Sequence, residues 1–221
     1  MVMYNADGSQ GQVAGNALRC VGKYLYESGR VKKEDMVIAT GAGKKQLTLF
    51  VRENTVFSVE VHMGYAEFEP TKVPVKLPGD KVINREVRLA GERCQITCLS
   101  MGNPHVVQFV EDVDQVDLKQ KGPSIENDPM FPERVNVSYA TLLSRNILKV
   151  RVWERGIGET MACGTAACAV AVAAVENGLC DREADIAIRL PGGELVLRYD
   201  ANGDVWMTGD AQKDFEGIIE V

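Results

Sequence analysis

A lone cysteine at the start of a predicted helix is the most chemically suggestive feature of this sequence. Cys163 follows the charged, glycine-rich stretch 154–160 and precedes the apolar run 166–176, which predicts a helix. Gly164 or Thr165 is the expected N-cap of that helix. Backbone N–H groups in the first turn have no partner inside a helix and favour negative charge. The position therefore suits a thiolate or a bound carboxylate, and a buried structural cysteine is the alternative.

The same arrangement occurs a second time near the N-terminus. The pair Gly15-Asn16 opens the segment 15–29, whose apolar residues recur at helical spacing, with Asn16 as the expected cap. Each predicted helix is followed by a charged link, a strand, a glycine turn and further strands. We interpret this as an internal duplication with an offset of about 150 residues. The position equivalent to Cys163 in the first copy is Ala14.

Alternating apolar and polar residues predict strands in both copies and between them. The predicted strands are 36–40, 59–64, 82–89, 94–100, 106–110, 135–140, 147–153, 186–190 and 204–209. Segments 121–123 and 127–132 are rich in glycine, proline, asparagine and aspartate, which predicts turns.

These elements predict an α/β (α+β) fold made of two duplicated units related by a pseudo-two-fold axis. In each unit a mixed, mostly antiparallel sheet is wrapped around a central helix. The first unit is expected to span 1–69, to be incomplete at its N-terminus, and to be completed by 209–221. The second unit is expected to span 70–208, with the proline-rich segment 70–78 as the linker.

Composition narrows the class of protein. The 221 residues are 45% hydrophobic and 25% charged, and the net charge of −6 argues against a nucleic-acid partner. No apolar run reaches the roughly 18 residues of a membrane span, and the N-terminus lacks the pattern of a signal peptide. Six cysteines without a C-x-x-C pair indicate free thiols in a reducing compartment, so we expect a cytoplasmic protein. With only His62 and His105, we expect no metal site.

Two helix N-termini that faced one cleft would suit a particular chemistry. Their N–H groups would hold a carboxylate and the charge that spreads onto it when the neighbouring α-carbon loses a proton. Thiols on opposite faces of that carbon would then remove and return the proton without a cofactor. Such a scheme needs a cysteine at the start of each helix, and Ala14 stands where the first is required.

Several short motifs carry a resemblance to a known family. They are Tyr4-Asn5-Ala6-Asp7-Gly8-Ser9, Gly15-Asn16-Ala17-Leu18-Arg19-Cys20, Gly102-Asn103-Pro104-His105, Phe131-Pro132, Val135-Asn136-Val137, Glu154-Arg155-Gly156-Ile157-Gly158-Glu159-Thr160 and Ala162-Cys163-Gly164-Thr165. In this order, spread over nearly the whole chain, they resemble diaminopimelate epimerase. The proline racemases are related, but the Asn-Pro-His and Glu-Arg-Gly motifs point to the epimerase branch.

The resemblance implies an isomerase that interconverts LL- and meso-diaminopimelate, a small diamino diacid, in lysine and peptidoglycan-precursor biosynthesis. It implies no cofactor and a two-base transfer of the α-proton between thiol and thiolate. Cys163 would be one of the two bases, and Glu154 and His105 would support catalysis. The residues implied in substrate binding are Asn5, Gly15, Asn16, Asn103, Asn136, Glu154, Arg155, Gly164 and Thr165.

The sequence departs from the family pattern at two places. Ala14 replaces the family cysteine, and Val13 replaces the methionine before it. A further N-terminal segment of the family, with a Gly-Asn-Asp-Phe motif, has no counterpart in the sequence. We therefore expect this chain to be inactive or impaired as an epimerase.

Other interpretations of these residues remain open at this point. The chain could be a relative that binds the substrate without turnover, or a thiol enzyme of another class in which His105 assists Cys163. Asn5 could serve only a turn, His105 could be a surface residue, and Glu154-Arg155 could be a surface ion pair. The other five cysteines are expected to be structural. The oligomeric state is left between a monomer and a homodimer.

Overall fold

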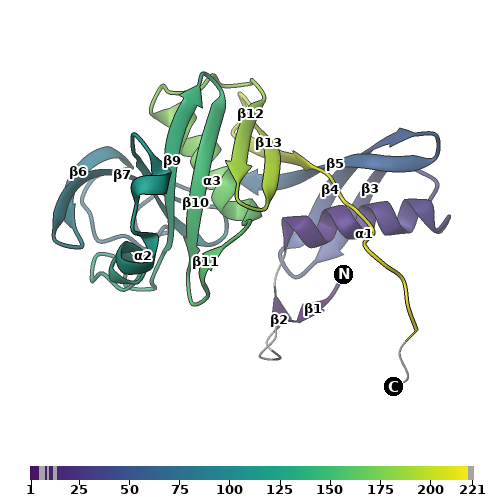
Figure 1. Cartoon of the computed structure of the whole chain (residues 1–221), viewed down its shortest axis with the longest axis horizontal. Coiled ribbons are helices and arrows are strands. Elements are labelled where there is room, and N and C mark those ends of the chain that lie inside the picture. Colours follow the sequence, from purple (N-terminus) through teal and green to yellow (C-terminus); the bar gives the residue numbers. More distant parts are fainter. Residues whose placement is uncertain (5–7, 9, 12–13, 219–221) are drawn as a thin grey trace. The chain divides into compact units, whose positions relative to one another are not determined.

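A computed structural model describes every residue of the chain except 5–7, 9, 12–13 and 219–221. The chain forms two compact units (Figure 1). Unit 1 contains residues 1–62 and 208–221, and unit 2 contains residues 63–207. The fold is α+β, with helices packed on sheets that are mixed and mostly antiparallel. Among the described residues, each helix is too short or too polar to span a bilayer.

Unit 1 places one helix on a small antiparallel sheet. Helix α1 (Gly15–Glu27) packs on strand β4 (Gly43–Arg52), which lies between β3 (Asp35–Thr40) and β5 (Thr55–Tyr65). Strands β1 (Met3–Tyr4) and β2 (Gln10–Gly11) form a separate short antiparallel pair. Leu18 of the helix is fully buried. A Cβ at Gly22 would lie 3.0 Å from a methyl of Leu47, so glycine permits the close approach of helix and sheet.

Unit 2 contains the larger sheet. Its strand order is β13-β12-β10-β9-β8-β7-β6, and β11 pairs with β10. The strands are β6 (Val82–Leu89), β7 (Glu92–Ser100), β8 (Pro104–Phe109), β9 (Asn136–Ser144), β10 (Ile147–Glu154), β11 (Gly158–Thr160), β12 (Ile186–Leu190) and β13 (Gly193–Tyr199). The β8–β9 and β10–β12 pairs are parallel and the other pairs in this unit are antiparallel. Strand β14 (Asp204–Gly209) returns the chain to unit 1.

Helix α3 (Gly164–Glu176) is the centre of unit 2. Every residue from 166 to 174 is buried, and the helix packs against β7, β8, β9, β12 and β13. A helix that is apolar all round belongs in a core, and its alanines allow strands to approach on several sides. The predicted sheet around a central helix is thus confirmed in this unit.

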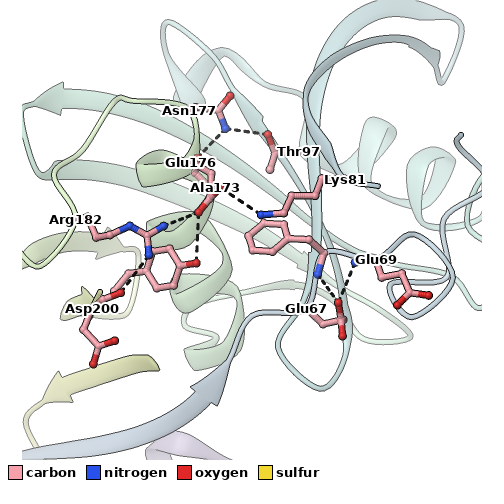
Figure 2. A network of polar contacts seen from close by, with 11 residues as sticks. Glu67, Glu69, Lys81, Thr97, Ala173, Glu176, Asn177, Arg182 and Asp200 are labelled. Atoms are coloured by element: carbon pink, nitrogen blue, oxygen red, sulfur yellow. Dashed lines mark hydrogen bonds and ion pairs between the residues drawn. The ribbon is translucent and has the colours of Figure 1, made fainter. Parts of the chain in front are cut away.

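Polar contacts anchor the C-terminal end of α3 (Figure 2). Glu176 accepts hydrogen bonds from Arg182 at 2.7 Å and from the Tyr199 hydroxyl at 3.3 Å. The Arg182 guanidinium also lies 4.0 Å from the centre of the Tyr199 ring. Asn177 donates to Thr97 on β7 at 2.9 Å, so the end of the helix is tied to two sides of the unit.

A second helix and a second core lie on the outer part of unit 2. Helix α2 (Leu118–Glu126) follows the 3-10 turn η1 (Val113–Gln115). It was predicted as a turn around 121–123, and that prediction is wrong. Asp117 caps the helix through Gln120 N–H, and Leu118 and Ile125 are buried in the core between α2 and strands β6–β9. Tertiary packing therefore outweighs the helix-breaking tendency of Gly122-Pro123.

Helices α1 and α3 repeat each other's geometry at both ends. The N-cap residues are Ala14, with φ −134° and ψ 120°, and Cys163, with φ −135° and ψ 113°. Just past each helix, Gly29 and Gly178 both have φ of 72°. The caps predicted from sequence, Asn16 and Gly164 or Thr165, were therefore misplaced by one or two residues. The methyl side chain of Ala14 makes no capping hydrogen bond to α1.

Candidate active site

Cys163 begins a run of polar contacts at the N-terminus of α3. Its Sγ lies 3.5 Å from the hydroxyl of Thr165. That hydroxyl accepts from Asn103 Nδ2 at 3.3 Å, and Asn103 Oδ1 lies 2.9 Å from His105 Nε2. Asn103 Nδ2 donates to one lone pair of the Thr165 oxygen, and the Thr165 proton can point at the sulfur. The run therefore ends at a hydroxyl that can donate to Cys163.

His105 is fully buried, which excludes the alternative of a surface histidine. Burial lowers its pKa to about 3, and the positive charge of Arg155 acts in the same direction. The imidazole is therefore neutral, with the proton on Nε2, which donates to Asn103 Oδ1. Nδ1 is buried and has no hydrogen-bond partner among the described residues. Since its Nε2 is bonded to Asn103 and its basicity is low, His105 does not act as the base that a Cys163 nucleophile would need.

Cys163 is only 7% exposed. Burial raises its pKa to about 11, and the nearby carboxylate of Glu154 adds to the increase. Hydrogen bonds from Thr165 and from the Ala166 amide lower the pKa, but by less. The expectation that the helix N-terminus favours a thiolate is therefore corrected: desolvation and a neighbouring negative charge outweigh the helix. The resting group is a protonated thiol.

The last residue of β10 and the turn that follows it supply two of the predicted residues, Glu154 and Arg155. The Glu154 carboxylate accepts from the Thr160 hydroxyl at 2.6 Å. The Arg155 guanidinium donates to the carbonyl oxygen of Glu133 at 2.9 Å. Each charged group is thus held by a neutral partner in the chain, which leaves its remaining bonding capacity available to a ligand.

Asn136 connects this turn to His105. The sheet register places Asn136 on β9 beside His105 on β8. Its side chain donates to Pro104 O at 2.8 Å and accepts from the Arg155 N–H at 3.0 Å. Asn136 is buried, and both ends of its amide are used within the protein. Asn136 thus joins the backbone at Pro104, next to His105, to the backbone at Arg155.

The equivalent start of α1 lies in unit 1. Ala14 is the N-cap and Gly15 is the buried first residue of the helix. The exposed Asn16 accepts from Arg19 at 3.0 Å through its Oδ1. Arg19, which is buried, also donates to Asp210 O at 3.0 Å and so ties the helix to the segment after β14. The predicted residue Asn5 lies outside the described residues.

The structure therefore connects the predicted residues of unit 2 through the contacts above. They are Asn103, His105, Asn136, Glu154, Arg155, Cys163 and Thr165, and Gly164 is the first residue of α3, between Cys163 and Thr165. Two further residues support them and were given no role from the sequence. Thr160 holds Glu154, and Glu126 of α2 accepts from the Gly156 N–H at 2.8 Å. Thr160 lies in the motif 154–160, but nothing in the sequence around Glu126 indicates its contact with Gly156.

Comparison with solved structures defines the class of fold. A probable proline racemase from Agrobacterium radiobacter K84 matches with a TM-score of 0.65 and 16% identity, over 97% of this chain and 71% of that one. A PhzF-family phenazine biosynthesis protein from Bacillus anthracis matches with a TM-score of 0.63 and 16% identity, over 92% of this chain and 74% of that one. A predicted epimerase from Pseudomonas aeruginosa has a TM-score of 0.61 and 20% identity, over 95% of this chain and 74% of that one. The chain thus has the fold shared by these racemase-, epimerase- and PhzF-type proteins.

Sequence comparison then gives the family. The family model described as diaminopimelate epimerase matches residues 97–213. Diaminopimelate epimerases of Acetivibrio thermocellus and Leptospira biflexa are 43% and 44% identical, each over 100% of this chain and 79% of the relative. The protein from Methanococcus maripaludis with the same name is 40% identical, over 100% of this chain and 79% of its own. The chain belongs to the diaminopimelate epimerase family, whose members are amino-acid epimerases and therefore isomerases.

Proposed function

We propose that this chain binds diaminopimelate and that Cys163 removes and returns the proton on one face of its α-carbon. The reaction of which this is half is the interconversion of LL- and meso-diaminopimelate, in lysine and peptidoglycan-precursor biosynthesis. The run of contacts from Cys163 through Thr165 and Asn103 to His105 carries the proposal, in a chain of this family. We further propose that the repeated helix geometry reflects a duplication that divides the chain into 1–69 with 209–221, and 70–208.

Substrate recognition follows from the charges around the site. The N–H groups of Gly164 and Thr165, in the first turn of α3, would hold the carboxylate beside the reacting carbon. The planar guanidinium of Arg155 would take the second carboxylate of the substrate through two parallel hydrogen bonds. Asn103 would complete the polar surface beside the α-carbon. In unit 1, Asn5, Gly15 and Asn16 are proposed to bind substrate as well.

The proton transfer proceeds from the thiolate of Cys163. The thiolate takes the α-proton and becomes a thiol, while the bonding electron pair stays on the carbon and spreads onto the adjacent carboxylate. The helix N–H groups stabilise that added charge. Glu154 is proposed to receive the proton of the resting thiol, since its carboxylate lies near enough to raise the pKa of Cys163. Returning the proton to the same face restores the starting configuration.

Inversion needs a second acid on the opposite face, and we propose that Ala14 is the position from which it is missing. Its backbone geometry matches that of Cys163 within a few degrees. The methyl side chain of alanine cannot carry a proton. The chain is therefore proposed to exchange the α-proton of one configuration without epimerising it.

Deuterium exchange tests this directly. LL- and meso-diaminopimelate are incubated with the chain in D₂O, and the α-proton signals are followed by NMR while chiral chromatography follows configuration. We expect deuterium to enter centres of one configuration only, with no interconversion. Ala14→Cys should add interconversion, and Cys163→Ala should abolish exchange. Exchange that persists in Cys163→Ala would disprove the role of this thiol.

A second function is binding without proton exchange. The pKa of about 11 at Cys163 favours it, because the thiolate is scarce at neutral pH. Calorimetry would then show saturable binding of diaminopimelate while the α-proton signals stay unchanged in D₂O, even at raised pH. Exchange that increases with pH would exclude this alternative.

A further inference from the structure

Glu126 is a buried carboxylate in an electrostatically unfavourable place. Its side chain is 7% exposed and it is the last residue of α2. Burying a charge is costly unless donors surround it, and the carbonyl groups at the C-terminal end of a helix repel an anion. A carboxylate retained at such a position must receive strong compensating hydrogen bonds.

Three donors surround this carboxylate. Oε2 accepts from the indole N–H of Trp153 at 2.7 Å. Oε1 accepts from the Gly156 N–H at 2.8 Å and from the Arg134 guanidinium at 3.2 Å. Trp153 and Gly156 flank Glu154 and Arg155 in the chain, so Glu126 holds the turn that carries these two residues at both of its ends.

The backbone of this turn is fixed amide by amide. The Arg155 N–H donates to Asn136 Oδ1 at 3.0 Å, the Gly156 N–H to Glu126, and the Ile157 N–H to Glu154 O at 3.0 Å. The Trp153 ring packs on α2 so closely that a Cβ at Gly122 would lie 2.4 Å from it. Two side chains from outside the turn therefore determine the direction in which Arg155 leaves the backbone.

We propose that Glu126 is a positioning residue that sets the Arg155 guanidinium for the second carboxylate of the substrate. The inference rests on the proposed function, because it assigns Arg155 that carboxylate. Glu126 touches neither the substrate nor Cys163 in this scheme. It acts through the Gly156 N–H and the Trp153 indole, and it gives the site its preference for a diacid.

A pair of ligands separates this role from a general loss of structure. LL-diaminopimelate and L-lysine share every group except the second carboxylate. Binding of each is measured by calorimetry to the full chain and to Glu126→Gln. The amide of glutamine is the same size but has one acceptor, so one donor loses its partner. We expect the Kd for diaminopimelate to rise about tenfold, equivalent to ~1.4 kcal/mol, while the Kd for lysine stays within about twofold.

Two further variants serve as controls. Glu133→Gln removes the same charge from an exposed side chain whose own backbone oxygen contacts Arg155, and it should leave both affinities unchanged. Trp153→Phe removes one donor while retaining an aromatic ring, and it should weaken diaminopimelate binding in the same direction as Glu126→Gln, by less. If Glu126→Gln fails to fold, the Trp153→Phe comparison decides the question. An equal loss of affinity for both ligands, or no loss of affinity for diaminopimelate, overturns the proposal.

NMR of the ligand-free chain distinguishes failure of this inference from failure of the proposed function. A parent chain that binds neither ligand would refute the proposed function. The Glu126 assignment would then be decided by hydrogen exchange at the Gly156 amide and the Arg155 side chain. Exchange at least about tenfold faster in Glu126→Gln supports the positioning role, and unchanged exchange at both groups overturns it.

Discussion

Ionisation of Cys163 should reduce the stability of the folded protein at alkaline pH. The pKa of this thiol is about 11 in the folded chain, against an ordinary value of 9.0. Between these values the unfolded chain releases the proton and the folded chain keeps it, so stability falls as pH rises from about 9 and the fall ends near 11. Two pKa units correspond to about 3 kcal/mol, of which about 2 kcal/mol should be lost by pH ~10.5.

The assay compares urea unfolding of the parent chain and of Cys163→Ser at about pH 8 and about pH 10.5. Serine has nearly the same shape and does not ionise in this range. The other thiols, including the buried Cys98, whose pKa burial also raises, are common to both proteins and cancel in the difference. The free energy of unfolding of the parent, relative to that of Cys163→Ser, should fall by about 2 kcal/mol between the two pH values. Cys20→Ser, at an exposed thiol, should retain the pH dependence of the parent.

A difference between parent and Cys163→Ser that does not change with pH would refute the reasoning. It would mean that the thiol ionises as readily in the folded chain as in the unfolded one. The N-terminus of α3 and the hydrogen bonds from Thr165 and Ala166 would then offset burial and Glu154 completely.

Three further results are expected. Glu154→Gln should lower the pKa of Cys163, because it removes the adjacent negative charge. Alkylation of Cys163 is followed as a function of pH by peptide mass spectrometry, and its midpoint should fall by about one pH unit. Gly122→Ala should destabilise the protein by about 2 kcal/mol in urea unfolding, since its Cβ would meet the Trp153 ring at 2.4 Å; an unchanged midpoint would contradict this packing. Leu18→Ala should cost about 3 kcal/mol and should speed amide exchange across α1, because this side chain is fully buried in unit 1.

Sequence patterns predicted most of the strands, because alternation is a local property of a half-buried sheet. The predicted strands 82–89, 186–190 and 204–209 match β6, β12 and β14 at both ends. Helix α2 was missed for a physical reason. Lys121-Gly122-Pro123 disfavours a helix locally, whereas the stabilising contacts of Gly122 come from Trp153, which lies far along the chain.

In the candidate site, too, residues in local motifs were predicted from the sequence, whereas burial and contacts between distant elements were not. Motif residues such as Asn103, His105 and Cys163 were identified together, and the structure links them through side-chain contacts. The ionisation of Cys163 was predicted in the wrong direction, since the sequence indicates a helix start but not the burial around it. Glu126 was not identified because its three partners come from other elements of unit 2.

The all-round burial of α3 has a consequence for how unit 2 can change. The helix that presents Cys163 is buried from residue 166 to residue 174, and its far end is held by hydrogen bonds of Asn177 and Glu176. Because the interior around the helix is close-packed, a larger residue in place of one of its buried alanines would displace the helix and the Cys163 sulfur with it. The position of the Cys163 sulfur and the packing of α3 therefore depend on the same buried side chains.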